Sequence, residues 1–162
     1  MKNHNSLILL IISIMITCSA KPSYSQGQKF IYAEAVGSGL LASINFDRRF
    51  QKDSREGMGF KAGIGTGSLI GFWDSKFNIP LGINYVKGKN KSAFLFGANL
   101  TTTLVDENAY EKSGVILVPS LDIGYRFRPL KKGFAFQATI NPCYVQDSGL
   151  SLVGGVGLGY AW

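Results

Sequence analysis

The sequence predicts an all-β protein, an eight-stranded antiparallel up-and-down transmembrane β-barrel. Apolar and polar residues alternate with a period of two along most of the chain, and no apolar period of 3.6 residues is sustained after the first 25 residues. Twenty glycines and a charged fraction of only 17% fit a protein with many tight turns. The connections between the alternating segments separate into a basic set and an acidic set. The 162 residues suffice for one domain.

The first 25 residues have the layout of a secretory signal peptide, with Lys2 followed by the apolar run 7–17 and then by small residues. The run is shorter than the ~20 residues that a membrane-spanning helix needs. Cleavage fits after Ala20 or after Ser25, and we prefer the second, which gives a barrel domain of residues 26–162. Two alternatives stay open, a retained membrane anchor and a lipoprotein modified at Cys18. The residues before Cys18 match the lipoprotein motif poorly.

Eight strand-like segments follow the signal region. They are residues 29–37, 40–50, 57–67, 79–87, 92–104, 114–128, 133–145 and 150–162. The sixth segment alternates most clearly, with an apolar face of Val115, Leu117, Pro119, Leu121, Ile123, Tyr125 and Phe127 opposite Ser120, Asp122, Gly124 and Arg126. Because proline removes a hydrogen-bond donor from a sheet, we expect Pro119 and Pro142 at bulges or near strand ends.

The connections differ in charge. The set formed by residues 51–56, 87–91 and 129–132, with the adjoining strand ends, holds 11 of the 15 basic residues after position 25. The other set, residues 37–39, 68–78, 105–113 and 146–149, holds five acidic residues and two lysines. Alternate connections lie at opposite ends of an up-and-down barrel. The separation therefore predicts this strand order, with one basic rim and one mildly acidic rim.

Three features favour a membrane barrel, whose apolar face points outward, over a soluble one. The polar face carries charges in mid-strand, and we expect them to form a polar network in the lumen: Glu34, Asp47, Lys61, Asp122 and Arg126. That face is also rich in glycine, which leaves space in a narrow lumen. Aromatic residues gather on the apolar face near the basic connections, as in an interfacial girdle. A soluble lipocalin-like barrel or sandwich remains the alternative.

The last strand shows these features together. Leu152, Val156, Leu158, Tyr160 and Trp162 form one large, apolar face, and the opposite face is mostly glycine. We expect the first face to meet lipid and the second to leave room for charged side chains from other strands. Trp162 should lie at the basic rim.

Several short stretches carry a resemblance to a known family. They are Tyr32–Glu34 with Gly37, Ser43–Phe46, Gly59–Gly65, Ile79–Tyr85, Gly124–Phe127 with Pro129 and Gly133, and Gly157–Trp162. Over residues 29–162 the pattern resembles the small outer-membrane β-barrel proteins, the OmpA/OmpX/OmpW-like group, and especially its short Bacteroidetes-type members. The resemblance implies the cell outer membrane, contact with membrane lipid and lipopolysaccharide, and an assembly signal at Tyr160 and Trp162 for the barrel-assembly machinery.

The residues favour no enzymatic activity. The one histidine, His4, lies in the signal region, so a near-neutral general base is lacking, and we expect no catalytic, cofactor-binding or metal site. Nucleic-acid binding is disfavoured because no recognition motif accompanies the modest positive charge. Cys143 should be packed and inert. Phe72 and Trp73 either contact lipopolysaccharide or a protein partner outside the barrel, or belong to a second aromatic girdle.

We therefore expect a monomeric outer-membrane barrel whose lumen is plugged by side chains. Its role would be structural or interactive: envelope integrity, adhesion or the binding of a partner. Two alternatives remain, a narrow channel or transporter for hydrophobic solutes, and a soluble secreted β-barrel that binds a small ligand. Alternation alone does not separate them.

Overall fold

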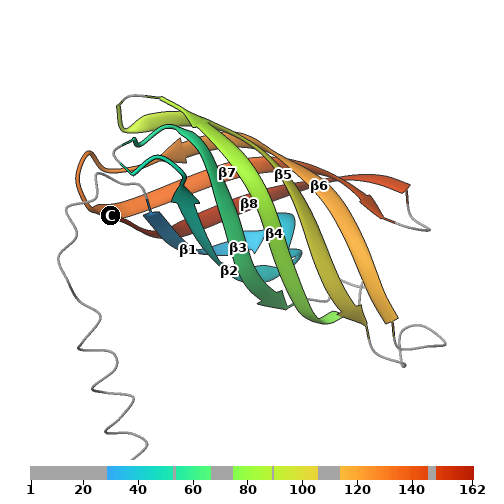
Figure 1. The fold of residues 1–162 in the computed structure, drawn as a ribbon. Helices are drawn as coiled ribbons and strands as arrows, with labels where there is room; N and C mark the ends of the chain where they lie inside the picture. The colour runs from blue at the N-terminus through green and yellow to red at the C-terminus, as the bar shows by residue number, and fades with distance from the viewer. Residues whose placement is uncertain (1–28, 53, 67–74, 89, 106–113, 146–148) are drawn as a thin grey trace, which may run out of the picture.

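The computed structural model describes residues 29–52, 54–66, 75–88, 90–105, 114–145 and 149–162. They form one closed antiparallel barrel of eight strands, in the order β1 to β8 around the wall (Figure 1). The strands are β1 (Lys29–Val36), β2 (Ala42–Arg49), β3 (Gly57–Thr66), β4 (Ser75–Lys87), β5 (Ser92–Val105), β6 (Gly114–Phe127), β7 (Gly133–Val145) and β8 (Gly149–Ala161). The predicted all-β class, the closed eight-stranded antiparallel barrel and the strand order are confirmed, and the transmembrane location stays a prediction.

The barrel closes between its first and last strands. Phe30 pairs with Ala161 and Val36 with Gly155, so β1 completes the ring against β8. Lys29 and Trp162 exchange two backbone hydrogen bonds of 3.0 Å beyond this ladder. The connections β2–β3, β4–β5 and β6–β7 lie at this same end, which we call the basic end. β4, β6 and β8 begin at the opposite end.

The two faces of the wall are assigned as the alternation predicts. Large apolar side chains point outward from every strand and are exposed, among them Ile44, Ile64, Leu81, Leu100, Leu121, Ile140, Leu152 and Leu158. The inward positions are buried and mostly polar, among them Glu34, Asn45, Asp47, Lys61, Asn84, Asn99, Asp122, Arg126, Gln137 and Asn141. Because side chains alternate between faces along a strand, one register fixes both sets together.

The first connection departs from the prediction. Residues 37–39 were expected at the acidic rim, but they form a short 3-10 helix, η1 (Gly37–Gly39), whose residues are all buried. It contacts β1 and β3–β8, so it lies inside the lumen rather than at a rim. β1 and β2 are accordingly shorter than predicted, eight residues each, because the chain leaves the wall at Val36 and rejoins it at Ala42.

Backbone geometry explains why the alternation did not reveal η1. Val36 and Leu40 flank it with φ of 61° and 72°, which non-glycine residues rarely adopt, and Gly37 has φ of 86°. The neighbouring structure must hold these two strained residues. Ser38 is buried like Tyr32 and Glu34 before it, so the alternation marks a connection at residues 37–39 but does not reveal that this connection enters the lumen.

Two further predictions about the strands were inaccurate. β4 begins at Ser75, four residues earlier than expected. Pro119 and Pro142 lie well inside β6 and β7, and they cause no bulge, because Ser120–Cys143 and Ile123–Ile140 share one register. The sheet accommodates each proline by losing backbone pairs to one neighbouring strand, while its ladder to the other neighbour is complete.

Candidate functional site

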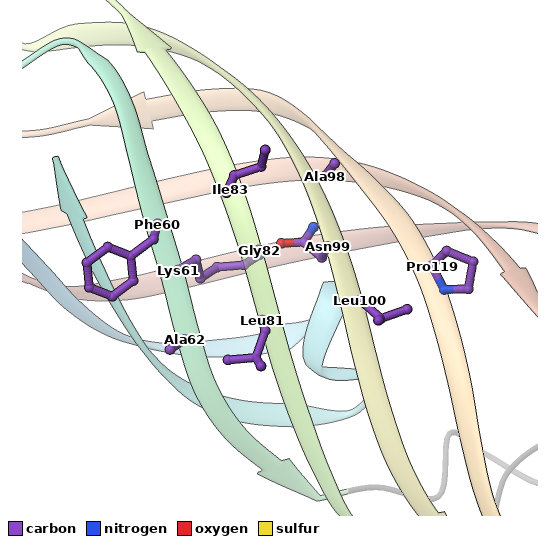
Figure 2. A pocket seen from close by; sticks show the side chains of 10 residues that line it. All are labelled: Phe60, Lys61, Ala62, Leu81, Gly82, Ile83, Ala98, Asn99, Leu100 and Pro119. Carbon is purple, nitrogen blue, oxygen red and sulfur yellow. The ribbon is translucent and has the colours of Figure 1, made fainter. Parts of the chain in front are cut away.

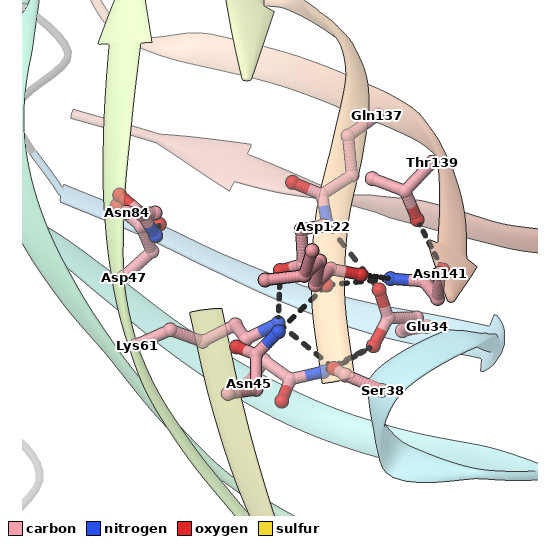
Figure 3. Close-up of polar contacts among 12 residues, drawn as sticks. Glu34, Ser38, Asn45, Asp47, Lys61, Asn84, Asp122, Gln137, Thr139 and Asn141 are labelled. Atoms are coloured by element: carbon pink, nitrogen blue, oxygen red, sulfur yellow. Dashed lines mark hydrogen bonds and ion pairs between the residues drawn. The ribbon is translucent and has the colours of Figure 1, made fainter. Parts of the chain in front are cut away.

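The lumen holds the only charged constellation that the sequence predicted, and its centre is an ion pair between Lys61 and Asp122 (Figure 3). Lys61 Nζ lies 2.6 Å from Asp122 Oδ2, and both residues are 2% exposed. Asn99 and Asn141 each donate a side-chain N–H to Asp122 Oδ1, at 2.8 and 2.5 Å. The carboxylate thus has one cation and two neutral donors, which is what a buried charge requires.

Glu34 links this pair to η1. Lys61 Nζ donates to Ser38 Oγ at 2.8 Å, and Ser38 Oγ donates to Glu34 Oε2 at 3.2 Å. Asn45 Nδ2 also donates to Glu34 Oε2, at 3.4 Å. The backbone of η1 is held as well, because Thr101 Oγ1 donates to the Ser38 carbonyl and Asn78 Nδ2 to the Gly39 carbonyl. These bonds hold the helix across the lumen.

Asp47 is the centre of a second group of charges nearer the basic end. Arg126 Nη2 lies 3.0 Å from Asp47 Oδ2, and Arg49 pairs with Asp47 Oδ1. Asn84 Nδ2 donates to Asp47 at 2.6 Å. Gln137 joins the two groups, since its Oε1 accepts from Arg126 and its Nε2 donates to Glu34 Oε1 at 3.3 Å. The lumen therefore contains one continuous polar network.

The structure brings all five predicted lumen residues into this network: Glu34, Asp47, Lys61, Asp122 and Arg126. Arg49 was instead grouped with the basic connections, but its side chain points inward. With Arg49 included, three carboxylates face three cations, so the charges balance. Among the described residues, Asp47 and Asp122 are ion-paired, whereas Glu34 is held by hydrogen bonds from neutral side chains such as Ser38 and Gln137.

The basic end of the lumen is closed by apolar side chains and two arginines. Phe30 stacks on Tyr32 with ring centres 4.4 Å apart, and the Arg126 guanidinium lies 5.1 Å from the Phe30 ring centre. Arg55 in the β2–β3 connection donates to the Arg128 and Pro129 carbonyls, and Arg128 donates to the Gly88 carbonyl. Three connections are thereby tied across the opening.

The burial of Arg128 beside other arginines destabilises its charged form. Burial and the nearby charges of Arg55, Arg126 and Arg49 lower the pKa of Arg128 to about 10. Burial also lowers the pKa of Arg55. With that pKa the Arg128 guanidinium stays protonated at neutral pH, and its hydrogen bond to the Gly88 carbonyl is charge-assisted.

The predicted girdle residues lie on the outer wall at the basic end. Tyr160 is exposed and its ring centre is 6.3 Å from that of Trp162. Lys29 Nζ lies 5.9 Å from the Trp162 ring centre, so Trp162 is at the basic rim as predicted. The other named pair, Phe72 and Trp73, and the signal region 1–25 lie outside the described residues.

Within the part of the chain that the structure describes, no helix is long and apolar enough to cross a membrane. The same residues include no cluster of three or more His, Cys, Asp and Glu side chains placed to hold a metal ion. Comparison with protein-family models, with curated proteins and with solved structures gives no match.

Proposed function

We propose that this chain is an integral outer-membrane β-barrel with a side-chain-filled lumen, and that its role is structural or interactive. The observation that carries the proposal is the inverted arrangement of the wall. Outward positions are apolar and exposed on all eight strands, and the charged residues of mid-strand lie inside. A soluble barrel would place these two sets the other way round.

The outer wall supports a lipid environment in a second way. Phe60, Leu81, Ile83, Leu100 and Pro119 surround the small side chains Ala62 and Ala98, and they line an apolar groove of about 590 Å³ on the outside of β3–β6 (Figure 2). A groove of this chemistry on a water-exposed surface would be an aggregation liability. In a bilayer it accommodates a lipid acyl chain.

Aromatic residues support the position of one interface. Phe60, Tyr85, Phe94, Tyr125, Phe134, Phe136, Tyr160 and Trp162 lie on the outer wall toward the basic end. Aromatic belts of this kind are found where a barrel wall meets the polar headgroups. The proposal places the basic end in the periplasm and Tyr160 with Trp162 as the signal that the assembly machinery reads.

The filled lumen supports a role other than solute diffusion. η1 and the polar network span the interior, and the arginines close the basic end. An eight-stranded barrel has an interior just wide enough for side chains or one small ligand, and not for an aqueous channel. Function then falls to the outer surface and the connections opposite the basic end: envelope integrity, adhesion or binding of a partner.

Fractionation and heat-modifiable gel migration test the membrane assignment. We expect the full chain in the outer-membrane fraction, with faster migration of the unheated, folded barrel. Recovery wholly in the soluble periplasm would overturn the proposal.

Conductance in planar bilayers tests the filled lumen separately. We expect no steady open-pore current from the reconstituted barrel. Sustained currents from a correctly inserted protein would contradict a plugged interior and leave the membrane assignment intact.

A further inference from the structure

One seam of the barrel wall, between β6 and β7, is incompletely paired. Backbone pairs join Phe127–Ile123 of β6 to Phe136–Ile140 of β7, then one isolated pair joins Ser120 to Cys143. Leu121 and Asp122 make no backbone pair with β7. Among the described residues, none is made beyond Ser120 toward the opposite end, although β6 continues to Gly114 and β7 to Val145.

The two prolines account for this gap. In the shared register Pro142 lies opposite Leu121, and Pro119 lies opposite Tyr144. Each proline nitrogen removes the donor that would complete a rung across this seam. The ladders on the other sides are uninterrupted, β5–β6 as far as Val105–Gly114 and β7–β8 as far as Val145–Gly149.

Pro80 provides an internal comparison. It interrupts the β3–β4 ladder after Ala62–Leu81, but pairing is found again at Gly65–Asn78. One proline thus leaves a local gap, whereas two prolines on facing strands leave the outer part of β6–β7 without ladder pairs among the described residues. Along this part of the seam, the described residues have few backbone pairs to break when the strands separate.

An apolar cluster lies on the inner side of the same seam. We call it the inner apolar cluster; it consists of Ile116, Val118, Cys143, Val145 and Val153. It lies further from the basic end than Asp122. Ile116 and Val153 remain partly exposed. The apolar residues at the basic end, in contrast, are fully buried. Apolar surface left open inside a polar lumen favours an apolar occupant.

Two hydroxyl groups border the cluster. Ser120 Oγ and Thr103 Oγ1 are buried, and neither has a hydrogen-bond partner among the described residues. Ser120 is opposite Cys143, and Thr103 is opposite Ile116. Buried polar groups are normally hydrogen-bonded, so these two indicate a ligand with a polar group beside its apolar part.

The outer side of the seam determines what can enter. Leu117, Pro119, Leu121, Ile140, Pro142 and Tyr144 line it. A polar solute would have to cross this apolar surface and a lipid layer. A hydrocarbon chain already dissolved in that layer would not.

We propose that the β6–β7 seam, from Asp122 toward the end opposite the basic end, is a lateral portal. A fatty acid or lipid enters from the membrane through this portal, and the inner apolar cluster binds its hydrocarbon chain. The polar end of the chain is bound by Ser120 and Thr103. This inference rests on the proposed membrane location, but it does not require an open pore, because η1 and the central network stay in place.

Photo-crosslinking in vesicles tests the portal. The probe is a straight-chain fatty acid with a terminal diazirine, and insertion sites are mapped by mass spectrometry of the full barrel. We expect insertions at inward positions, Ile116, Val118 and Val153, as well as at the outward residues Leu117 and Leu152. Labelling of outward residues reports the lipid-facing wall, and labelling of inward residues reports the portal.

A disulfide across the seam provides the decisive variant. Ser120→Cys places a second thiol directly opposite the native Cys143, within the range of strand spacings that a disulfide bridges. The oxidised barrel should lose its inward insertions, keep its outward ones and recover the first set on reduction. Ser120→Ala controls for the lost hydroxyl. Ile79→Cys/Thr102→Cys in a Cys143→Ser background locks the β4–β5 seam from outside instead, and should leave inward labelling unchanged.

Three results would overturn the inference. Inward labelling that is absent from the native barrel excludes the binding site. Inward labelling that persists in the oxidised Ser120→Cys barrel shows that the chain enters by an end and not through the wall. Absence of outward labelling as well contradicts the membrane location itself, and with it the portal.

Discussion

Lys61 on β3 and Asp122 on β6 form an ion pair across the lumen, with Nζ and Oδ2 2.6 Å apart, although their strands are three positions apart around the barrel. The pair is also the point at which η1 joins the network, because the same Lys61 ammonium donates to Ser38. Gly82 lies opposite Lys61 in the β3–β4 register, and the Asn99 side chain, which donates to Asp122, lies where a Cβ at Gly82 would be.

Replacement of Lys61 tests the pair. Lys61→Met leaves the buried Asp122 carboxylate without its cation, and should lower the free energy of unfolding by about 3–5 kcal/mol. Urea unfolding in detergent micelles measures it. Lys61→Met/Asp122→Asn should recover part of the loss, because the amide carries no charge and still meets Asn99. A double variant as unstable as the sum of the singles would contradict the pairing.

An arginine on the outer wall tests the face assignment. Leu121→Arg should impair insertion by about 2–4 kcal/mol if Leu121 lies at mid-depth in lipid. Leu130→Arg is the matched control, since Leu130 is similarly exposed, 52% against 49%, but lies in the β6–β7 connection. The folded fraction on an unheated gel gives the readout. Equal effects at the two positions would show that Leu121 does not face lipid.

Alanine substitutions at two glycines with positive φ, Gly37 in η1 and Gly149 in β8, distinguish backbone strain from packing. Gly37→Ala strains the backbone, because φ is 86°, and it also places Cβ 3.0 Å from the Glu34 carboxyl carbon. Gly149→Ala has φ of 77° with nothing within 4 Å of the new Cβ. We expect a loss of about 1–2 kcal/mol at Gly149, and a larger one at Gly37. Urea midpoints compare them, and equal losses would mean that η1 is loosely held.

Two glycines of β8 test why the inner face of that strand is bare. A Cβ at Gly159 would overlap the Ile31 carbonyl oxygen and the Tyr32 backbone, whereas at Gly154, on the outer face, the nearest atom is 3.9 Å away. Gly159→Ala should therefore disrupt closure of β1 on β8, at a cost of about 3 kcal/mol or more. Gly154→Ala should be neutral or slightly stabilising. Heat-modifiable migration distinguishes them, and two folded barrels of equal stability would contradict the crowding.

Much of this architecture follows from alternation. The period of two assigns each residue to one face, and the separation of basic from acidic connections predicts the strand order, so Glu34, Asp47, Lys61, Asp122 and Arg126 could all be placed inside. The predictions about location, function and the assembly role of Tyr160 and Trp162 remain proposals, because the fold does not decide them.

Three other features of the structure could not be predicted from the alternation of apolar and polar residues. A connection at residues 37–39 was predicted, but its place inside the lumen was not, because small and polar residues suit a turn at the rim equally well. The burial of Gly37–Gly39 and the backbone angles of Val36 and Leu40 reveal it only in the structure. Arg49 was assigned to the rim because it follows Arg48 at a strand end. The incomplete pairing of the β6–β7 seam depends on Pro119 and Pro142 lying on facing strands in one register, which the sequence alone does not give.

The position of η1 also bears on the order of folding. It belongs to the first hairpin of the chain, yet its contacts with β3–β8 exist only when the last strand is in place. Bonds such as Lys61 to Ser38 and Thr101 to the Ser38 carbonyl join η1 to β3 and β5, and we expect the complete set to form only as the barrel closes. Interactions that are absent from the transition state slow unfolding without hastening folding. We therefore expect the inserted turn to slow unfolding and so to lengthen the lifetime of the closed barrel.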